Sequence, residues 1–179
     1  KIKSKEKEKN RWGKLESLIG GADGAKFNQI AQSLNLRRLI VEANEFLRQL
    51  SSRYTLEVDD SQEIFGLKLI VIDQEQDYQV RQLVNLSGGE TFQLSLALAL
   101  GLSELSSGGC QLESLFIDEG FGTLDQETLA QVLVALQGLK ATGKTVGIIT
   151  HVSGIREHIP YGVELKVHVG GRGEVVILD

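Results

Sequence analysis

The stretch LFIDEGFGTLD, residues 115–125, places two carboxylates directly after a short apolar strand. Open α/β sheets bind ligands at the carboxyl ends of their strands, so Asp118 and Glu119 are candidates for a ligand site. The alternative is a strand that ends in a polar turn, because a few apolar residues before Asp-Glu also occur by chance. The Gly-Thr-Leu-Asp that follows is equally consistent with a turn into a helix whose N-cap is Asp125.

A second motif, LSGGE at residues 86–90, precedes a segment rich in Leu and Ala. In a capping box, the hydroxyl of Ser87 would cap a backbone N–H, and Glu90 would reach back to the N–H of the cap residue. Gly88 and Gly89 would also let a ligand approach the backbone, where the N–H groups and dipole of a helix N-terminus favour phosphate. The two interpretations are compatible.

Hydrophobic spacing and turn residues predict alternating helices and strands. The expected helices cover 1–12, 14–19, 25–50, 92–100 and 126–140, and the expected strands cover 54–58, 64–72, 114–117, 146–149, 163–169 and 175–178. Residues 92–100 alternate like a strand but contain no β-branched residue, so we expect a helix there. The alternation of strands with helices indicates an α/β sheet.

Residues 138–145, GLKATGKT, match the pattern of a phosphate-binding P-loop. A working P-loop follows a strand and opens a helix, so that the helix N-terminus faces the phosphates. Here the expected helix 126–140 precedes the pattern, and the expected strand 146–149 follows it. We therefore expect Gly143 to end the helix and Lys144 to lie near its negative end.

Composition indicates one soluble globular domain, since 41% of the 179 residues are hydrophobic and 24% are charged. No apolar stretch approaches the roughly 18 to 20 residues of a membrane span, and the lysine-rich start does not resemble a signal peptide. These features predict a cytoplasmic protein. A single cysteine, Cys110, and three separated histidines predict neither an internal disulfide nor a zinc site.

Charge is distributed unevenly along the chain. Residues 1–14 hold seven of the 19 basic residues and two of the 24 acidic ones, which leaves 12 basic and 22 acidic residues elsewhere. The acidic body gives no indication of a nucleic-acid surface, although the basic start could touch a phosphate backbone. A solvated helix surface is the more ordinary interpretation of that basic run.

The motifs occur in the order found in the C-terminal part of ATP-binding-cassette ATPases: LSGGE, an apolar strand with Asp-Glu, a Leu-Asp loop, and a histidine after the next strand. The strand resembles a Walker B motif, in which Asp118 would hold Mg²⁺ through its water shell. Glu119 would orient or deprotonate the attacking water, and His151 would sense the γ-phosphate. These three residues would act on ATP bound to their own head.

The wider sequence resembles the C-terminal head segment of the SbcC family, the ATPase subunits of a bacterial exonuclease complex. The resemblance rests on LSGGE, on FIDEGFGTLD, on ITH at 149–151, and on the Arg-Trp that precedes Leu-Ile-Gly near the N-terminus. It implies an α/β fold, the C-terminal lobe of a split ABC-type P-loop NTPase head, at 25–179. A coiled-coil stub and turn would occupy 1–24. The P-loop would belong to an N-terminal half, so the ATPase would be incomplete in this fragment.

The resemblance also implies composite sites shared by two heads. Ser87, Gly88 and Gly89 would contact the γ-phosphate of ATP held by the opposite head, and Asp125 would lie at the dimer seam. The cofactors would be ATP and Mg²⁺. The implied partners are the N-terminal half of the same protein, a second head, an SbcD-like nuclease subunit, and double-stranded DNA ends or hairpins, without a membrane.

Two other function classes use the same motifs. A chromosome-maintenance or recombination clamp would entrap DNA with such a head and without a nuclease. A transporter ATPase would couple the motifs to membrane subunits, but transporter cassettes usually carry a P-loop ahead of the signature in one continuous domain. We expect a DNA-repair ATPase head that controls a separate nuclease, with the clamp as the alternative.

Overall fold

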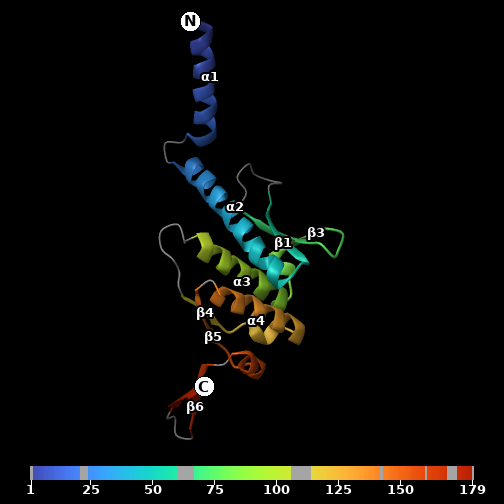
Figure 1. Cartoon of the computed structure of the whole chain (residues 1–179). Coiled ribbons are helices and arrows are strands. Elements are labelled where there is room, and N and C mark those ends of the chain that lie inside the picture. Colours follow the sequence, from blue (N-terminus) through green and yellow to red (C-terminus); the bar gives the residue numbers. More distant parts are fainter. Residues whose placement is uncertain are drawn as a thin grey trace. The chain divides into compact units, whose positions relative to one another are not determined.

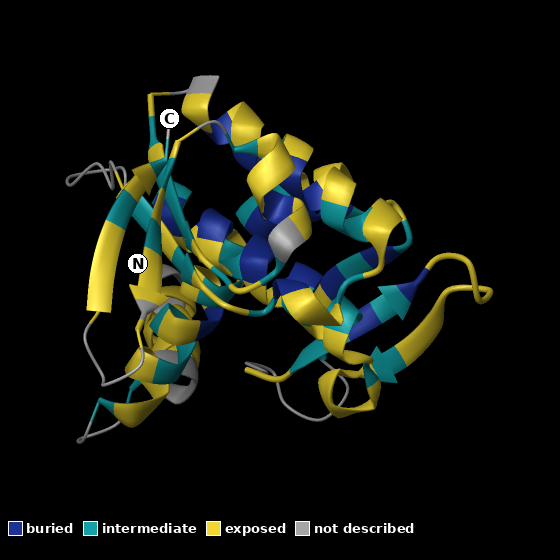
Figure 2. Ribbon diagram, turned by 90° about the horizontal axis from the view of Figure 1, so that it is seen from below, coloured by how far each residue is buried: buried dark blue, intermediate teal, exposed yellow. Residues whose placement is uncertain are grey.

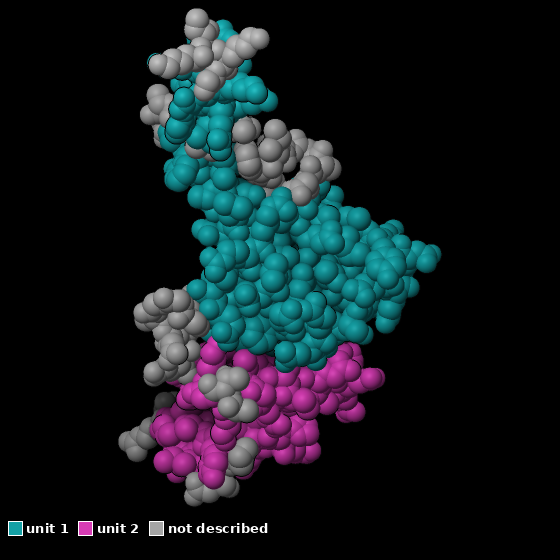
Figure 3. All heavy atoms as spheres, turned by 45° about the horizontal axis from the view of Figure 1, so that its top comes forward, with its two compact units in different colours: residues 1–87, 93–111 teal, residues 88–92, 112–179 magenta. Residues whose placement is uncertain are grey.

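Helices and short strands alternate through most of the chain in the computed structural model (Figure 1). The residues that the structure describes are 2–20, 24–59, 67–105, 114–141, 143–159, 161–168 and 173–178. They form two units: residues 1–87 with 93–111, and residues 88–92 with 112–179 (Figure 3). The expected boundary between a coil stub at 1–24 and a lobe at 25–179 stays a prediction.

The first unit begins with two helices, α1 (Ile2–Ile19) and α2 (Ala25–Leu50). Residues 5–16 of α1 are exposed, as expected for a helix with very few apolar residues. α2 begins after Gly24, whose φ of 68° lies in the left-handed region that glycine favours. The structure therefore confirms the helices expected at 1–12, 14–19 and 25–50, the first two as one continuous helix, and the break before Ala25.

One face of α2 is buried in the first unit, and Figure 2 draws the buried residues of the chain in dark blue. Ile40, Ala43, Leu47 and Leu50 are each at most 7% exposed. α3 (Gly88–Leu105) confirms the helix expected at 92–100, and its Gly101 lies close to α2. A Cβ at Gly101 would lie 2.7 Å from the backbone nitrogen of Ala43, so glycine lets these two helices approach closely.

The sheet of the first unit is antiparallel, in the order β1 (Tyr54–Val58), β2 (Leu69–Asp73), β3 (Gln79–Gln82). The predicted hairpin is confirmed, but its second strand begins at Leu69. Residues 64–66 of the predicted strand lie outside the described residues. β3 was not predicted, because the turn before it carries Asp77 and Tyr78 at φ 48° and 57° instead of the glycine that usually marks such a turn.

Asn44 connects α2 to this sheet. Its Nδ2 donates a hydrogen bond of 3.0 Å to the carbonyl oxygen of Leu56, and the N–H of Leu56 donates one of 2.9 Å to its Oδ1. Leu56 itself is fully buried, with Leu47 and Val71 also at 0% exposure. The side chain of Asn44 thus supplies the edge of β1 with the partners that another strand would otherwise provide.

The second unit contains a parallel strand pair. β4 (Ser114–Asp118) pairs with β5 (Thr145–Ile149), and α4 (Gln126–Ala141) connects them. An antiparallel hairpin, β6 (Gly162–Val167) and β7 (Gly173–Leu178), ends the chain. These elements confirm the predicted strands and helix, whereas the residues that connect the hairpin, 169–172, lie outside the described residues.

The P-loop-like pattern lies where a helix ends. α4 stops at Ala141, Gly143 has a φ of 85°, and β5 follows. The N–H of Gly143 bonds the carbonyl of Lys140 at 3.0 Å, and the N–H of Lys144 bonds that of Leu139 at 3.4 Å. This pair of bonds is the Schellman pattern of a helix C-terminus, so the glycine ends a helix and does not cradle phosphate.

Candidate active site

Both parallel strands of the second unit end at the candidate site. Asp118, the last residue of β4, pairs in register with Ile149, the last residue of β5. The N–H of the next residue, Glu119, donates a hydrogen bond of 2.9 Å to the carbonyl oxygen of Ile149. His151 follows two residues after β5, so the adjacent strand ends bring Asp118, Glu119 and His151 to one edge of the sheet.

Glu119 and His151 are in direct contact at this edge. Oε2 of Glu119 lies 2.8 Å from Nδ1 of His151. An ionised carboxylate only accepts hydrogen bonds, so the ring donates through Nδ1 and leaves Nε2 for another partner. The side chains of Glu119 and His151 are 48% and 80% exposed, so a ligand from solvent can reach both.

The backbone of Glu119 is strained. Its φ of 61° lies in the left-handed region, where a residue other than glycine costs about 1 to 3 kcal/mol. The strand hydrogen bond of its N–H and the contact of its side chain with His151 offset this cost. Such strain clusters at functional sites, which makes Glu119 a candidate catalytic residue on structural grounds as well.

The loop after Glu119 packs against the first turns of α3. The rings of Phe92 and Phe121 are 5.0 Å apart at their centroids, and Phe121 is only 1% exposed. A Cβ at Gly120 would lie 2.5 Å from the ring of Phe92, and Gly120 has a φ of 97°, so only glycine fits without a shift. Sequence reasoning missed this aromatic contact. A glycine directly after the two acids is the one signal that could have indicated it.

The two glycines of LSGGE also face this loop. A Cβ at Gly88 would lie 3.2 Å from Cγ2 of Thr123, and a Cβ at Gly89 would lie 3.2 Å from the carbonyl oxygen of Thr123. Thr123 belongs to the short 3₁₀ helix η3 (Phe121–Thr123), and its hydroxyl donates a hydrogen bond of 2.9 Å to the carbonyl of Gly120. The glycines therefore have a packing role inside this unit, in addition to the ligand role that we expect.

Asp125 is the N-cap of α4, as the sequence predicts. Its Oδ1 accepts a bond of 2.9 Å from the N–H of Thr128, and its Oδ2 accepts one of 2.8 Å from the hydroxyl of Thr128. These bonds lower the pKa of the Asp125 carboxyl, the backbone bond most strongly. Asp125 is nevertheless exposed, so its carboxylate remains accessible to a partner.

Ser87 lies directly before Gly88, the first residue of α3, which is the position of a cap residue. It is exposed. Ser87 is the last residue of the 1–87 segment of the first unit, whereas Gly88 and Gly89 belong to the second unit.

The residues present fit a magnesium ion that arrives with a nucleotide. Among the described residues, no group of three His, Cys, Asp or Glu side chains could hold a metal ion by themselves. Asp118 offers one exposed carboxylate at the strand edge. Mg²⁺ in nucleotide sites is typically held by one or two carboxylates together with waters and phosphate oxygens, so a single acid at this position suits it.

Comparison with known proteins identifies the family. The family model described as SbcC/RAD50-like, Walker B motif, matches residues 56–138. Over 163 residues the chain is 47% identical to the SbcC component of nuclease SbcCD from Pseudomonas aeruginosa, and over 136 residues it is 50% identical to that from Staphylococcus saprophyticus. The chain belongs to the SbcC family. It spans 13% of the length of each of these two relatives, although the alignments cover 91% and 73% of the chain itself.

Solved SMC heads share the fold of this SbcC-family chain. A structure described as concerning ATP-driven dimerization and DNA-stimulated activation of SMC ATPases matches with a TM-score of 0.66 at 15% identity, covering 84% of this chain and 89% of that one. The Smc head bound to the C-winged helix domain of ScpA matches with a TM-score of 0.63 at 17% identity, covering 81% and 43%. The expected fold class, a lobe of an ABC-type head, is therefore confirmed.

In the described part of the chain, no helix combines the length and the apolar character that crossing a bilayer requires.

Proposed function

We propose that the chain is the C-terminal half of an ATPase head that hydrolyses ATP as an engaged dimer and controls a nuclease acting on DNA ends or hairpins. The observation that carries the proposal is the contact between Glu119 and His151 at the carboxyl ends of two adjacent parallel strands. In α/β folds such strand ends are where ligands bind. The membership of the chain in the SbcC family supports the same function.

Within one head, Glu119 orients or deprotonates the water that attacks the γ-phosphate. Its position is favourable because the strand pair fixes its backbone while its carboxylate stays half exposed. His151 holds that carboxylate through Nδ1 and can meet the γ-phosphate through Nε2. Mg²⁺ would neutralise charge on the phosphates, with Asp118 as its protein ligand through water.

The signature residues act on the ATP of the opposite head. Ser87, Gly88 and Gly89 lie at the start of an 18-residue helix, where backbone N–H groups and the helix dipole favour a phosphate. The contacts of Gly88 and Gly89 with Thr123 couple this turn to the loop that carries Asp125. We propose that Asp125, exposed while it caps α4, lies at the seam between the two heads.

An N-terminal half of the head completes each site and supplies the P-loop. Exposed apolar side chains on the strands of the second unit support this part of the proposal. Phe116 of β4 is 71% exposed and Ile149 of β5 is 55% exposed. On the hairpin, two cross-strand pairs on one face are 64 to 76% exposed, namely Val163 with Ile177 and Leu165 with Val175. Apolar strand faces of this kind are typically covered by a further part of the fold.

The names of the relatives support the nuclease partner in this proposal. The relatives at 47% and 50% identity are named as parts of nuclease SbcCD, whereas the SMC heads match at only 15 to 18% identity. An SbcD-like nuclease subunit is therefore the partner that we propose, in preference to a clamp or a transporter. The cytoplasm is the compartment in which such a complex would meet DNA.

The test is the substitution Glu119→Gln in a head reconstituted with its N-terminal half. Glutamine keeps the shape of the side chain but cannot act as a base, so ATP should still bind while hydrolysis stops and engaged dimers accumulate. Glu157→Gln is the matched control, because Glu157 is an exposed acid of η4 (Ser153–His158) in the same unit. Equal hydrolysis by Glu119→Gln and the wild type would remove Glu119 from the catalytic role.

A further inference from the structure

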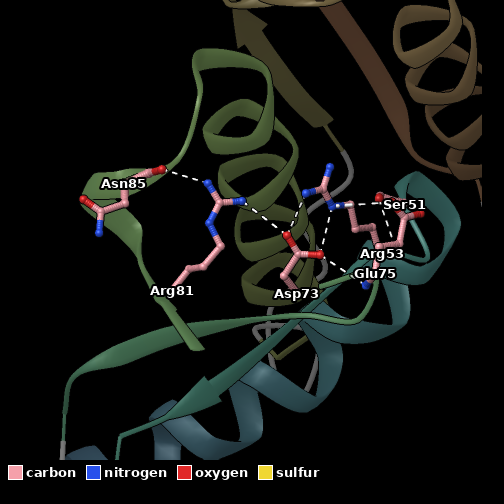
Figure 4. A network of polar contacts seen from close by, with 6 residues as sticks. All are labelled: Ser51, Arg53, Asp73, Glu75, Arg81 and Asn85. Atoms are coloured by element: carbon pink, nitrogen blue, oxygen red, sulfur yellow. Dashed lines mark hydrogen bonds and ion pairs between the residues drawn. The ribbon is translucent and has the colours of Figure 1, made fainter. Parts of the chain in front are cut away.

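A buried carboxylate in the first unit is held by two arginines (Figure 4). Asp73, the last residue of β2, is 0% exposed. Nε of Arg53 donates to Oδ1 of Asp73 at 2.9 Å, and Nη2 of Arg53 donates to Oδ2 at 2.7 Å. The N–H of Glu75 adds a bond of 3.2 Å to Oδ1. Asp73 thus has a bidentate cationic partner and a main-chain donor apart from the second arginine.

Arg81, on β3, is that second arginine. Its Nη1 lies 3.4 Å from Oδ2 of Asp73, and its Nη2 donates a hydrogen bond of 2.9 Å to the carbonyl oxygen of Asn85 (Figure 4). Because Arg53 already neutralises Asp73, the buried charge does not by itself require Arg81. The shorter of these two contacts of Arg81 is the one with the main chain at Asn85.

Asn85 ends the short 3₁₀ helix η1 (Leu83–Asn85) and lies two residues before Ser87. No residue of η1 is buried, and Val84 is 84% exposed. Apolar side chains therefore hold the segment only in part, with Leu83 36% exposed, and polar contacts contribute to its order. These include the bond from Arg81 and a bond of 3.3 Å from the N–H of Leu86 to the carbonyl of Leu83.

We propose that Arg81 is a positioning residue for the signature loop: it links the buried Asp73 to the main chain at Asn85 and thereby fixes the approach to Ser87. A guanidinium suits this role because two of its N–H groups reach two separate acceptors in a fixed geometry. The consequence for hydrolysis rests on the proposed function, in which Ser87 acts on the ATP of the opposite head. The effect of Arg81 on the order of the loop does not rest on the proposed function.

The loop is tested first, by hydrogen exchange in the 179-residue chain. Arg81→Gln should raise amide exchange in residues 83–89 severalfold while leaving β1 unchanged, because the anchor of the segment is lost but Arg53 still pairs Asp73. Arg53→Gln is the matched control. It removes the stronger partner of the same carboxylate, so it should lower the stability of the whole sheet without a selective effect on 83–89. Exchange in 83–89 that is unchanged by Arg81→Gln overturns the proposal.

Hydrolysis is tested next, in the head reconstituted with its N-terminal half. Arg81→Gln should lower turnover about tenfold, the loss expected for one hydrogen bond to a charged group, while each head binds ATP with unchanged affinity. Arg81→Lys keeps the charge but has one nitrogen in place of two, so it should restore only part of the activity. Full turnover by Arg81→Gln, in a head where Ser87→Arg is inactive, also overturns the proposal.

The trans role of Ser87 and the positioning role of Arg81 would be contradicted by different results. If Ser87→Arg hydrolyses ATP normally, the trans role of the signature in the proposed function is wrong, whatever Arg81 does. If Ser87→Arg is inactive and exchange in 83–89 is selectively raised by Arg81→Gln together with reduced turnover, the positioning role of Arg81 is supported.

Discussion

His151 contacts Glu119 through Nδ1, the ring nitrogen nearer to its own backbone, at 2.8 Å from Oε2. In this geometry the two ring nitrogens have different partners: Nδ1 contacts the carboxylate, and Nε2 is available to a phosphate. Donation from Nε2 to phosphate requires either a doubly protonated ring or a ring that leaves Glu119, because the neutral ring carries only one N–H. If the ring stays neutral, the contact with Glu119 is therefore expected to break when Nε2 donates to a phosphate.

Substitutions at His151 can test this division. Asparagine places an amide nitrogen near the position of Nδ1, whereas glutamine reaches the position of Nε2. If Nε2 meets the γ-phosphate, His151→Asn should lose hydrolysis by about 100-fold or more, the typical loss for one transition-state donor, and His151→Gln should lose less. Steady-state turnover of the reconstituted head checks this, and the reverse order of the two variants would contradict the assignment of Nε2.

Gly120 should tolerate no side chain. A Cβ there would lie 2.5 Å from the ring of Phe92, and the φ of 97° disfavours any L-residue. Gly120→Ala should therefore destabilise the second unit by about 1 to 3 kcal/mol. Gly138→Ala is the control, because Gly138 lies inside α4 with nothing within 4 Å of its added Cβ, and it should stabilise by about 0.5 to 1 kcal/mol. Urea unfolding followed by circular dichroism measures both; equal effects would refute the account.

Lys144 should be dispensable for nucleotide binding. It follows Gly143 at the C-terminal end of α4, where the pattern of hydrogen bonds is that of a helix end. Lys144→Ala should leave ATP binding and turnover of the reconstituted head nearly unchanged, and the chain alone should bind Mg-ATP more weakly than micromolar. Calorimetry is the measurement. Loss of ATP binding in Lys144→Ala, to the extent seen with the P-loop lysine of the N-terminal half, would show that residues 138–145 bind phosphate.

Asp73 should make the first unit sensitive to acid. The hydrogen bonds of Arg53 hold its pKa below the usual value of Asp, and the charges of Arg53 and Arg81 act in the same direction against the effect of burial. A depressed folded pKa contributes stability that is fully present above the unfolded pKa of about 3.9 and is lost as pH falls through the folded pKa. Asp73 should therefore stabilise at pH 7 and progressively less below pH 4.

Asp73→Asn isolates that contribution. At pH 7 the variant should be less stable by about 3 kcal/mol, since it leaves Arg53 without its charged partner, and the difference from the wild type should shrink below pH 4. Glu75→Gln is the control, because Glu75 is 68% exposed and 3.7 Å from Nε of Arg53. Urea unfolding at several pH values decides the matter, and a difference that stays constant with pH would exclude the linkage.

The sequence was sufficient to predict the elements that have a strong local signal. The β4 strand, the capped helix after Asp125 and the helix end at Gly143 each depend on residues close together in the chain, and all three are confirmed. β3 was missed, because the turn before it has Asp77 and Tyr78 at positive φ and lacks the glycine that usually marks such a turn in a sequence.

Contacts between distant segments were beyond sequence reasoning. The packing of Phe92 on Phe121 depends on how α3 meets the loop after β4, and the link from Arg81 to Asp73 depends on the pairing of β2 with β3. Leu34 has helical spacing yet is 58% exposed, because the buried face of α2 was set by what packs against it. For the same reason the contact of Glu119 with His151 could be expected only through a resemblance to a family.

Mixing two inactive mutants tests whether the signature residues act on the ATP of the opposite head, as we propose. Ser87→Arg puts bulk where the γ-phosphate should approach the start of α3, and the second mutant lacks the P-loop lysine in the N-terminal half. In a heterodimer one composite site combines both defects and the other combines two intact motifs. Each mutant must be inactive alone, and heterodimers must be shown to form. Hydrolysis should then partly return; activity that stays at the sum of the separate mutants would contradict a trans role for Ser87 with independently firing sites.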